Sequence, residues 1–136
     1  TTSSIMNTSK SRQGNKIEAR NKTFKAGQIL ENAGITFGLI TDAPFVPIEG
    51  QLLQAALYVK NGLSREMALK CLTINNAIIT DIDSRVGSLE PGKDADVVIW
   101  DVEPLATLSQ VGIVIIDGQI AYRRKAGESN VDYQKL

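Results

Sequence analysis

The 136-residue chain changes character at about Asp81, and this change constrains its fold more than any other feature of the sequence. Before that position, apolar residues recur every three or four residues between charged ones, which is the period of amphipathic helices. After it, glycine and proline arrive at short intervals and separate apolar runs rich in β-branched residues, VVIW and VGIVII, which favour strands. The sequence therefore predicts an α/β part over residues 17–80 and a β part over residues 81–124.

The α/β part begins as the α-to-β half of a parallel repeat. We expect a helix from Ile17 to about Ala33, stopped by Gly34, and then a buried strand over the apolar run Thr36–Ile40. Polar composition predicts a tail or loop over residues 1–16 and a polar C-terminal tail over residues 125–136.

Three further helices are expected after the prolines that follow the strand. The first covers GQLLQAALYVKNG, and its predicted buried face consists of Leu52, Leu53, Ala56 and Val59. Ser64 and Thr73 are predicted N-caps of two shorter helices, REMALKCL and INNAIIT. In the β part, the pair Asp117-Gly118 between two apolar runs predicts a hairpin, because both residue types tolerate the positive φ of a type I′ turn.

Composition excludes several classes of partner. Fifteen basic residues balance fifteen acidic ones, so no net field predicts binding to nucleic acid or to a membrane. No run is long enough to span a bilayer. A single cysteine and a start without an apolar signal core favour the cytoplasm.

The candidate site is Asp42, which follows the predicted strand directly in the stretch TFGLITDAPFVP. An acid at the end of a buried strand is a common position for catalysis. The simpler interpretation is that the carboxylate only caps a turn amide. The chain contains no histidine, so an enzyme built around Asp42 needs partners from elsewhere.

Three other features have structural explanations. GSLEPGK, residues 87–93, has the glycine and lysine spacing of a phosphate-binding loop, but Asp94 replaces the hydroxyl residue and Pro91 removes a donor, which favours a plain turn. Cys71 is expected to be a packed core thiol, since no histidine is present to activate it. The irregularly spaced acids do not match a calcium loop and are expected to be solvated turn residues: Asp81, Asp83, Glu90, Asp94 and Asp96.

Two longer stretches resemble a known family. VGSLEPGKDADVVIWD followed by VIIDGQIAYRR resembles the end of the metal-dependent amidohydrolase superfamily, in particular its imidazolonepropionase-like and prolidase-like members. RNKTFKAGQILENAGITFGLITDAP and GLSREMALKCLTINNA resemble the last helix, the final barrel strand and the closing helices of the same proteins, in the same order. The resemblance covers about residues 17–124.

The resemblance implies an incomplete α/β fold. Amidohydrolases have a (β/α)8 barrel, which takes roughly 250 residues, and a small composite β-sandwich. The chain would supply the last barrel strand and helices over residues 17–80 and the C-terminal sandwich strands over residues 81–124. The family binds zinc or another divalent metal through histidines on earlier strands and an aspartate at the end of the last strand. Only Asp42 matches this set, as metal ligand and general base, and Ala43 stands where relatives commonly have histidine.

The resemblance therefore implies that this chain alone lacks the histidine ligands, holds no cofactor and is inactive. Its expected partner is the N-terminal barrel segment of a parent enzyme, from the same gene or a separate chain. The parent would hydrolyse a C–N bond in a cyclic amide or peptide-like compound by metal-activated water. The alternative is a non-enzymatic remnant that works as an assembly or binding module. Isolated, the chain is expected to form a homo-oligomer, because unpaired strand edges and apolar faces are usually covered by another chain.

Overall fold

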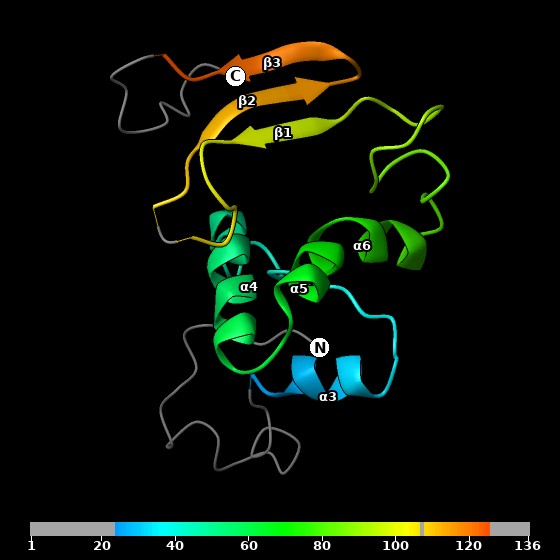
Figure 1. Cartoon of the computed structure of the whole chain (residues 1–136), viewed down its shortest axis with the longest axis vertical. Coiled ribbons are helices and arrows are strands. Elements are labelled where there is room, and N and C mark those ends of the chain that lie inside the picture. Colours follow the sequence, from blue (N-terminus) through cyan, green and yellow to red (C-terminus); the bar gives the residue numbers. More distant parts are fainter. Residues whose placement is uncertain (1–23, 107, 126–136) are drawn as a thin grey trace.

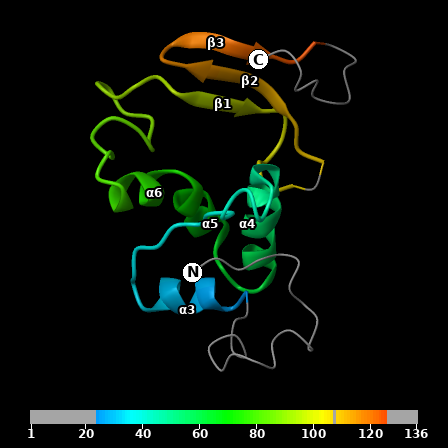
Figure 2. The same cartoon turned by 180° about the vertical axis from the view of Figure 1, so that it is seen from behind.

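Helices fill one end of the molecule and a three-stranded sheet the other in the computed structural model, which describes residues 24–106 and 108–125 (Figure 1). The helices are α3 (Ala26–Asn32), the 3₁₀ helix η1 (Ile48–Gly50), α4 (Gln51–Lys60), α5 (Arg65–Leu72) and α6 (Ile74–Ile79). The strands are β1 (Val97–Trp100), β2 (Val111–Ile116) and β3 (Gln119–Arg123). Seen from behind, α4, α5 and α6 lie between α3 and the sheet (Figure 2).

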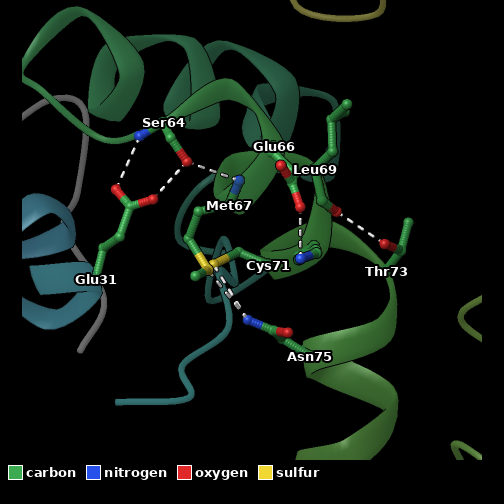
Figure 3. A network of polar contacts seen from close by, with 9 residues as sticks. Glu31, Ser64, Glu66, Met67, Leu69, Cys71, Thr73 and Asn75 are labelled. Carbon is green, nitrogen blue, oxygen red and sulfur yellow. Dashed lines mark hydrogen bonds and ion pairs between the residues drawn. The ribbon is translucent and has the colours of Figure 1, made fainter. Parts of the chain in front are cut away.

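The ends of the helices follow from local sequence. Gly34 stops the first helix with a φ of +66°, and the predicted start of this helix lies outside the described residues. Ser64 is the N-cap of α5, as predicted, because its Oγ accepts a hydrogen bond from the Met67 amide at 3.1 Å. Glu31 of α3 joins this cap by accepting hydrogen bonds from the Ser64 amide and hydroxyl (Figure 3).

The cap predicted at Thr73 is wrong in its mechanism. Thr73 does precede α6, but its side chain caps no amide of that helix. Its hydroxyl instead donates to the Leu69 carbonyl at 2.8 Å, and so closes the end of α5. The hydroxyl of a threonine between two nearly continuous helices can donate to a carbonyl of the first helix or accept from an amide of the second. Here it donates to the carbonyl of the first helix.

The predicted strand Thr36–Ile40 is not a strand in this structure. No strand pairs with it within residues 24–106 and 108–125, where the only sheet is β1-β2-β3. A strand exists only through a ladder with a neighbour, and in a parallel α/β fold that neighbour comes from another βα unit. Within this segment, the Phe37 carbonyl and the backbone groups of Leu39 instead form hydrogen bonds with α4, α5 and α6.

The predicted buried face of α4 is wrong in part, since Leu52, Ala56 and Val59 are half-buried rather than buried. Its buried residues are Gln54, Ala55 and Tyr58, whereas Leu53 is 55% exposed. The face is fixed by its neighbours: Tyr58 makes an edge-to-face contact with Phe24 at 5.3 Å between ring centroids. Val59 packs at the margin of the same core.

The core is small and lies among the helices. Its buried cluster combines the segment 36–41 with α4 and α5, and consists of Leu39, Ala55, Tyr58, Leu63, Ala68 and Cys71. Gly27 of α3 approaches this cluster so closely that a Cβ there would lie 2.8 Å from the Tyr58 ring. The core therefore ties α3 and the segment 36–41 to the later helices.

The sheet is antiparallel, in the order β1-β2-β3, and its strands match the predicted runs. The turn between β2 and β3 is the predicted hairpin turn, with φ of +49° at Asp117 and +73° at Gly118. Within the described residues, no helix is long and apolar enough to cross a bilayer.

Candidate functional site

Asp42 lies at the surface, directly after the segment 36–41. Thr41 before it is buried, while Asp42 and the following Ala43 are exposed. Its φ is +64°, a left-handed conformation that aspartate adopts more readily than most residues. Its carbonyl accepts a hydrogen bond from the Phe45 amide at 3.0 Å, which turns the chain sharply.

The Asp42 carboxylate is open to a partner. Among residues 24–106 and 108–125, no donor or cation lies within hydrogen-bond or ion-pair distance of it, so the simple turn-cap interpretation has no support from these residues. The carboxylate can accept a proton or bind a cation, but the described residues supply nothing to complete such a site.

Below Asp42, the backbone is held by three helices. The Phe37 carbonyl accepts hydrogen bonds from Cys71 Sγ at 3.2 Å and Asn75 Nδ2 at 3.0 Å. The Leu39 carbonyl accepts from Gln51 Nε2 at 3.0 Å and Asn76 Nδ2 at 3.3 Å, and the Leu39 amide donates to the Cys71 carbonyl at 3.1 Å. These amide side chains were not among the residues predicted from the sequence. The signal was two adjacent asparagines, poor helix formers, inside a predicted helix.

The residues present do not fit a catalytic metal. In the part of the chain that the structure describes, no three His, Cys, Asp or Glu side chains gather to hold an ion. One exposed carboxylate is too few, because catalytic sites of this kind use at least three converging protein ligands.

Cys71 is a core thiol. It is fully buried in α5, and burial raises the pKa of its thiol to about 11, partly opposed by the hydrogen bond from Asn75. Figure 3 shows its sulfur facing Asn75 and Met67. A thiol that stays protonated and inaccessible is a poor nucleophile, which agrees with the core position predicted from the sequence.

The acidic residues between Asp81 and Asp96 lie in turns, and several of them stabilise these turns. Asp94 pairs with Arg85 at 2.5 Å, and Asp96 accepts a hydrogen bond from the Asp117 amide at 2.8 Å, which ties the start of β1 to the hairpin. Glu90 accepts from the Ser88 hydroxyl at 2.7 Å. Asp81 is exposed at the end of α6 with a φ of +60°, and Asp83 is half-buried in the next turn.

The GSLEPGK stretch is a closed loop. Lys93 turns back and donates to Ser88 Oγ at 2.6 Å. Gly87, with a φ of +93°, lies so close to α6 that a Cβ would come within 2.9 Å of the Ile74 backbone. The loop is a packed turn, not a cradle for phosphate.

Two cavities lie on either side of α6. The larger, of about 670 Å³, lies between the helices and β1 and has a mainly apolar lining that includes Leu52, Leu72, Val86 and Trp100. The smaller, of about 310 Å³, follows the segment from Phe37 to Ile40 on the side of α3. Asp42 lines neither cavity.

Fold and site together define an α/β protein that ends in a small antiparallel sheet and presents an aspartate after an anchored apolar segment. The amidohydrolase family model matches residues 2–121 of the chain. The chain therefore belongs to the amidohydrolase family, as the sequence motifs indicated. This family is generally metal-dependent.

Individual proteins agree with this assignment. The chain is 34% identical over 103 residues to an amidohydrolase, tasK, from Hapsidospora irregularis, covering 76% of this chain and 10% of that protein. It is similar to the crystal structure of an amidohydrolase from Thermotoga maritima, with a TM-score of 0.76, 39% identity and coverage of 81% of this chain and 29% of that one. For a putative prolidase from Bifidobacterium longum, the TM-score is 0.64, the identity 32% and the coverage 74% and 26%. The chain thus spans less than a third of the length of each.

Proposed function

We propose that this chain is the C-terminal part of an amidohydrolase that hydrolyses a C–N bond in a cyclic amide or peptide-like substrate. In the complete enzyme, Asp42 would be one ligand of a divalent metal such as zinc and would serve as the general base, and the metal would supply an activated water once ligands from outside this chain completed the site. The other ligands come from an N-terminal barrel segment, on the same polypeptide or a separate chain. Family membership and the similarity to an amidohydrolase and a putative prolidase support the reaction class.

One observation carries the role of Asp42: an exposed carboxylate without a partner among the described residues follows a segment that three helices hold in place. The same anchoring would place a base reproducibly against a substrate or a metal, which is the requirement for general base catalysis.

The test compares Asp42→Asn with the parent sequence in the complete enzyme, with the histidine-bearing segment supplied on one polypeptide or by co-expression. Asn keeps the shape but removes the base, so turnover should fall by roughly two to four orders of magnitude. Asp81→Asn is the matched control, because Asp81 is also exposed and has nearly the same φ of +60°. An unchanged rate for Asp42→Asn would show that Asp42 only ends the segment.

Two further arms belong to the same experiment. The chain without the histidine-bearing segment should show no turnover and should retain no stoichiometric metal after dialysis, because one carboxylate cannot hold it. Ala43→His restores the residue that similar proteins commonly have, and should raise turnover in the complete enzyme if that residue contributes to the chemistry.

A further inference from the structure

A tight turn follows Asp42 and carries an exposed phenylalanine. The Phe45 amide donates to the Asp42 carbonyl at 3.0 Å, and a β-turn of this kind holds the Cα atoms of its first and last residues within about 7 Å. Phe45 is 87% exposed, more than any other large apolar side chain in the described part of the chain. The other two phenylalanines, Phe24 and Phe37, pack against the core. An exposed aromatic ring is therefore held on the same turn as the candidate base.

The backbone of this turn is restrained on both sides of Phe45. Pro44 and Pro47 each fix one φ angle, and the φ of Pro47 is −55°. The Gly50 amide donates to the Pro47 carbonyl at 3.0 Å, so a second turn follows the first directly. A side chain on a restrained backbone loses less conformational entropy on binding than one on a flexible loop, which favours a role in recognition.

Two exposed isoleucines extend the apolar surface before and after the turn. Ile40 is 55% exposed and Ile48 is 66% exposed. Thr41, between Ile40 and Asp42, is buried. Alternate residues of an extended segment point to the same side, so Ile40 and Asp42 share the exposed side. We call Ile40, Phe45 and Ile48 the apolar lip.

The charge around the apolar lip is negative. Residues 36–59 contain no lysine, arginine or histidine, and their only charged side chains are Asp42 and Glu49. Both are exposed. A carboxylate on a ligand would therefore be repelled here, with no cation on the same segment to pair with. An uncharged apolar group would instead bury surface against Phe45.

We infer that the apolar lip contacts the substrate and selects an uncharged apolar group next to the C–N bond that is cleaved, an inference that rests on the proposed function. In a (β/α)8 enzyme, the loops that follow the strands form the active site, and in the proposed complete enzyme the turn after Asp42 is such a loop. The apolar lip takes no part in bond cleavage. Phe45, as its most exposed member, is the main specificity-determining residue.

Two pairs of probes test the preference in the complete enzyme, one pair for each compound class of the proposed function. The cyclic amides are isobutyl-substituted and carboxymethyl-substituted hydantoin, and the peptides are leucylglycine and aspartylglycine. Within each pair, the side chain changes from apolar to carboxylate. We expect Phe45→Ala to lower the ratio of kcat/KM for the apolar member to that for the carboxylate member by about ten- to a hundredfold, as for other hydrophobic pocket contacts.

Leu89→Ala is the matched control. Leu89 is also a large apolar residue and is 77% exposed, but it lies in the loop between α6 and β1. Its replacement should leave the ratio within about twofold of the parent value.

Two further replacements of Phe45 separate its chemistry from any effect on folding. Phe45→Leu keeps an apolar side chain and should hold the ratio within about threefold of the parent value. Phe45→Lys supplies a cation and should reverse the preference in favour of the carboxylate member. Because Phe45 lies outside the described core, all three variants should unfold at the same urea concentration as the parent chain.

Fluorine NMR detects the contact without turnover. The chain contains three phenylalanines, so replacing them with para-fluorophenylalanine gives three signals, and Phe45→Leu identifies that of Phe45. The labelled chain carries Asp42→Asn and is combined with the unlabelled histidine-bearing segment. The apolar probe should shift the Phe45 signal and leave those of Phe24 and Phe37 unchanged. A Phe45 signal that shifts when the segment is added and then ignores the probe would show that the apolar lip joins the two chains, and would overturn its role in substrate selection.

The apolar lip and the proposed function fail separately. Turnover lost in Asp42→Asn, together with an unchanged ratio in Phe45→Ala, overturns only the role of the lip. An unchanged rate in Asp42→Asn, or no turnover of any probe by the complete enzyme, overturns the proposed function and the role of the lip with it.

Discussion

At the scale of single residues, Glu31 links α3 to α5 through a carboxylate that the solvent reaches. Hydrogen bonds from the Ser64 hydroxyl and amide hold the pKa of Glu31 below its usual value of 4.5. A carboxylate whose pKa is lower in the folded state stabilises the fold above its unfolded pKa, and this contribution disappears as the pH falls through the folded pKa.

Glu31→Gln should therefore lower the free energy of unfolding at neutral pH, and the difference from the parent chain should shrink as the pH falls below about 4.5. Urea unfolding at about pH 7 and about pH 3 measures it. Ser64→Ala, which also removes the cap of α5, should cost about 0.5–2 kcal/mol, and Glu31→Gln should cost less in that background. A deficit for Glu31→Gln that is equally large at both pH values would contradict this role of the carboxylate.

Cys71 is the other residue whose chemistry the fold sets. Its pKa of about 11 against an ordinary value of about 9.0 leaves roughly a hundredfold less thiolate at pH 8, and its sulfur is buried. Alkylation by iodoacetamide at pH 8, followed by mass spectrometry, should thus be at least about two orders of magnitude slower in the native chain than in urea. Similar rates in both conditions would show that the core around Cys71 opens readily.

At the scale of elements, the hairpin β2–β3 depends on its turn. Gly118 has a φ of +73°, and a Cβ there would meet only Ala95 Cβ at 3.9 Å, so space is not limiting. Gly118→Ala should destabilise the chain by about 1–2 kcal/mol through backbone strain alone, and Gly118→Asn by less, since asparagine tolerates this conformation. Denaturant midpoints of the three chains test the order, and an alanine variant as stable as glycine would exclude the strain.

The elements also show what the sequence could predict. Periodicity, Ser64 and the Asp117-Gly118 pair placed α5, the hairpin and all three strands correctly, because these depend on residues close in the chain. The buried face of α4 and the state of the segment 36–40 depend on which surfaces meet in space, and periodicity does not contain that information. For the site, sequence placed Asp42 after an apolar segment but missed the side-chain amides of Gln51 and Asn75, which lie 12 and 38 residues from the carbonyls that they bind.

At the scale of the whole molecule, the described residues bury few apolar side chains and leave many large ones exposed. The core is one small cluster, while large apolar side chains lie exposed on the sheet, among them Val98, Ile99, Ile116 and Ile120. Within the described part, β1 and β3 are open edges of the sheet, and a mainly apolar cavity of about 670 Å³ separates β1 from the helices. Open edges and apolar faces of this kind favour contact with another chain.

We therefore expect the isolated chain to self-associate, and Ile120→Lys on the edge strand β3 to shift it toward the monomer. Ile120 is 56% exposed, so the lysine disturbs no core, but it places a charge on the edge where another strand would pair. Ile29→Lys is the control, because Ile29 is 63% exposed on α3, at the opposite end of the molecule (Figure 1). Light scattering over a range of concentrations measures the mass of each chain. If the histidine-bearing segment covers the same apolar surfaces, adding it should replace the homo-oligomer with a complex of the two chains. A parent chain that stays a compact monomer at high concentration would mean that these apolar faces need no partner.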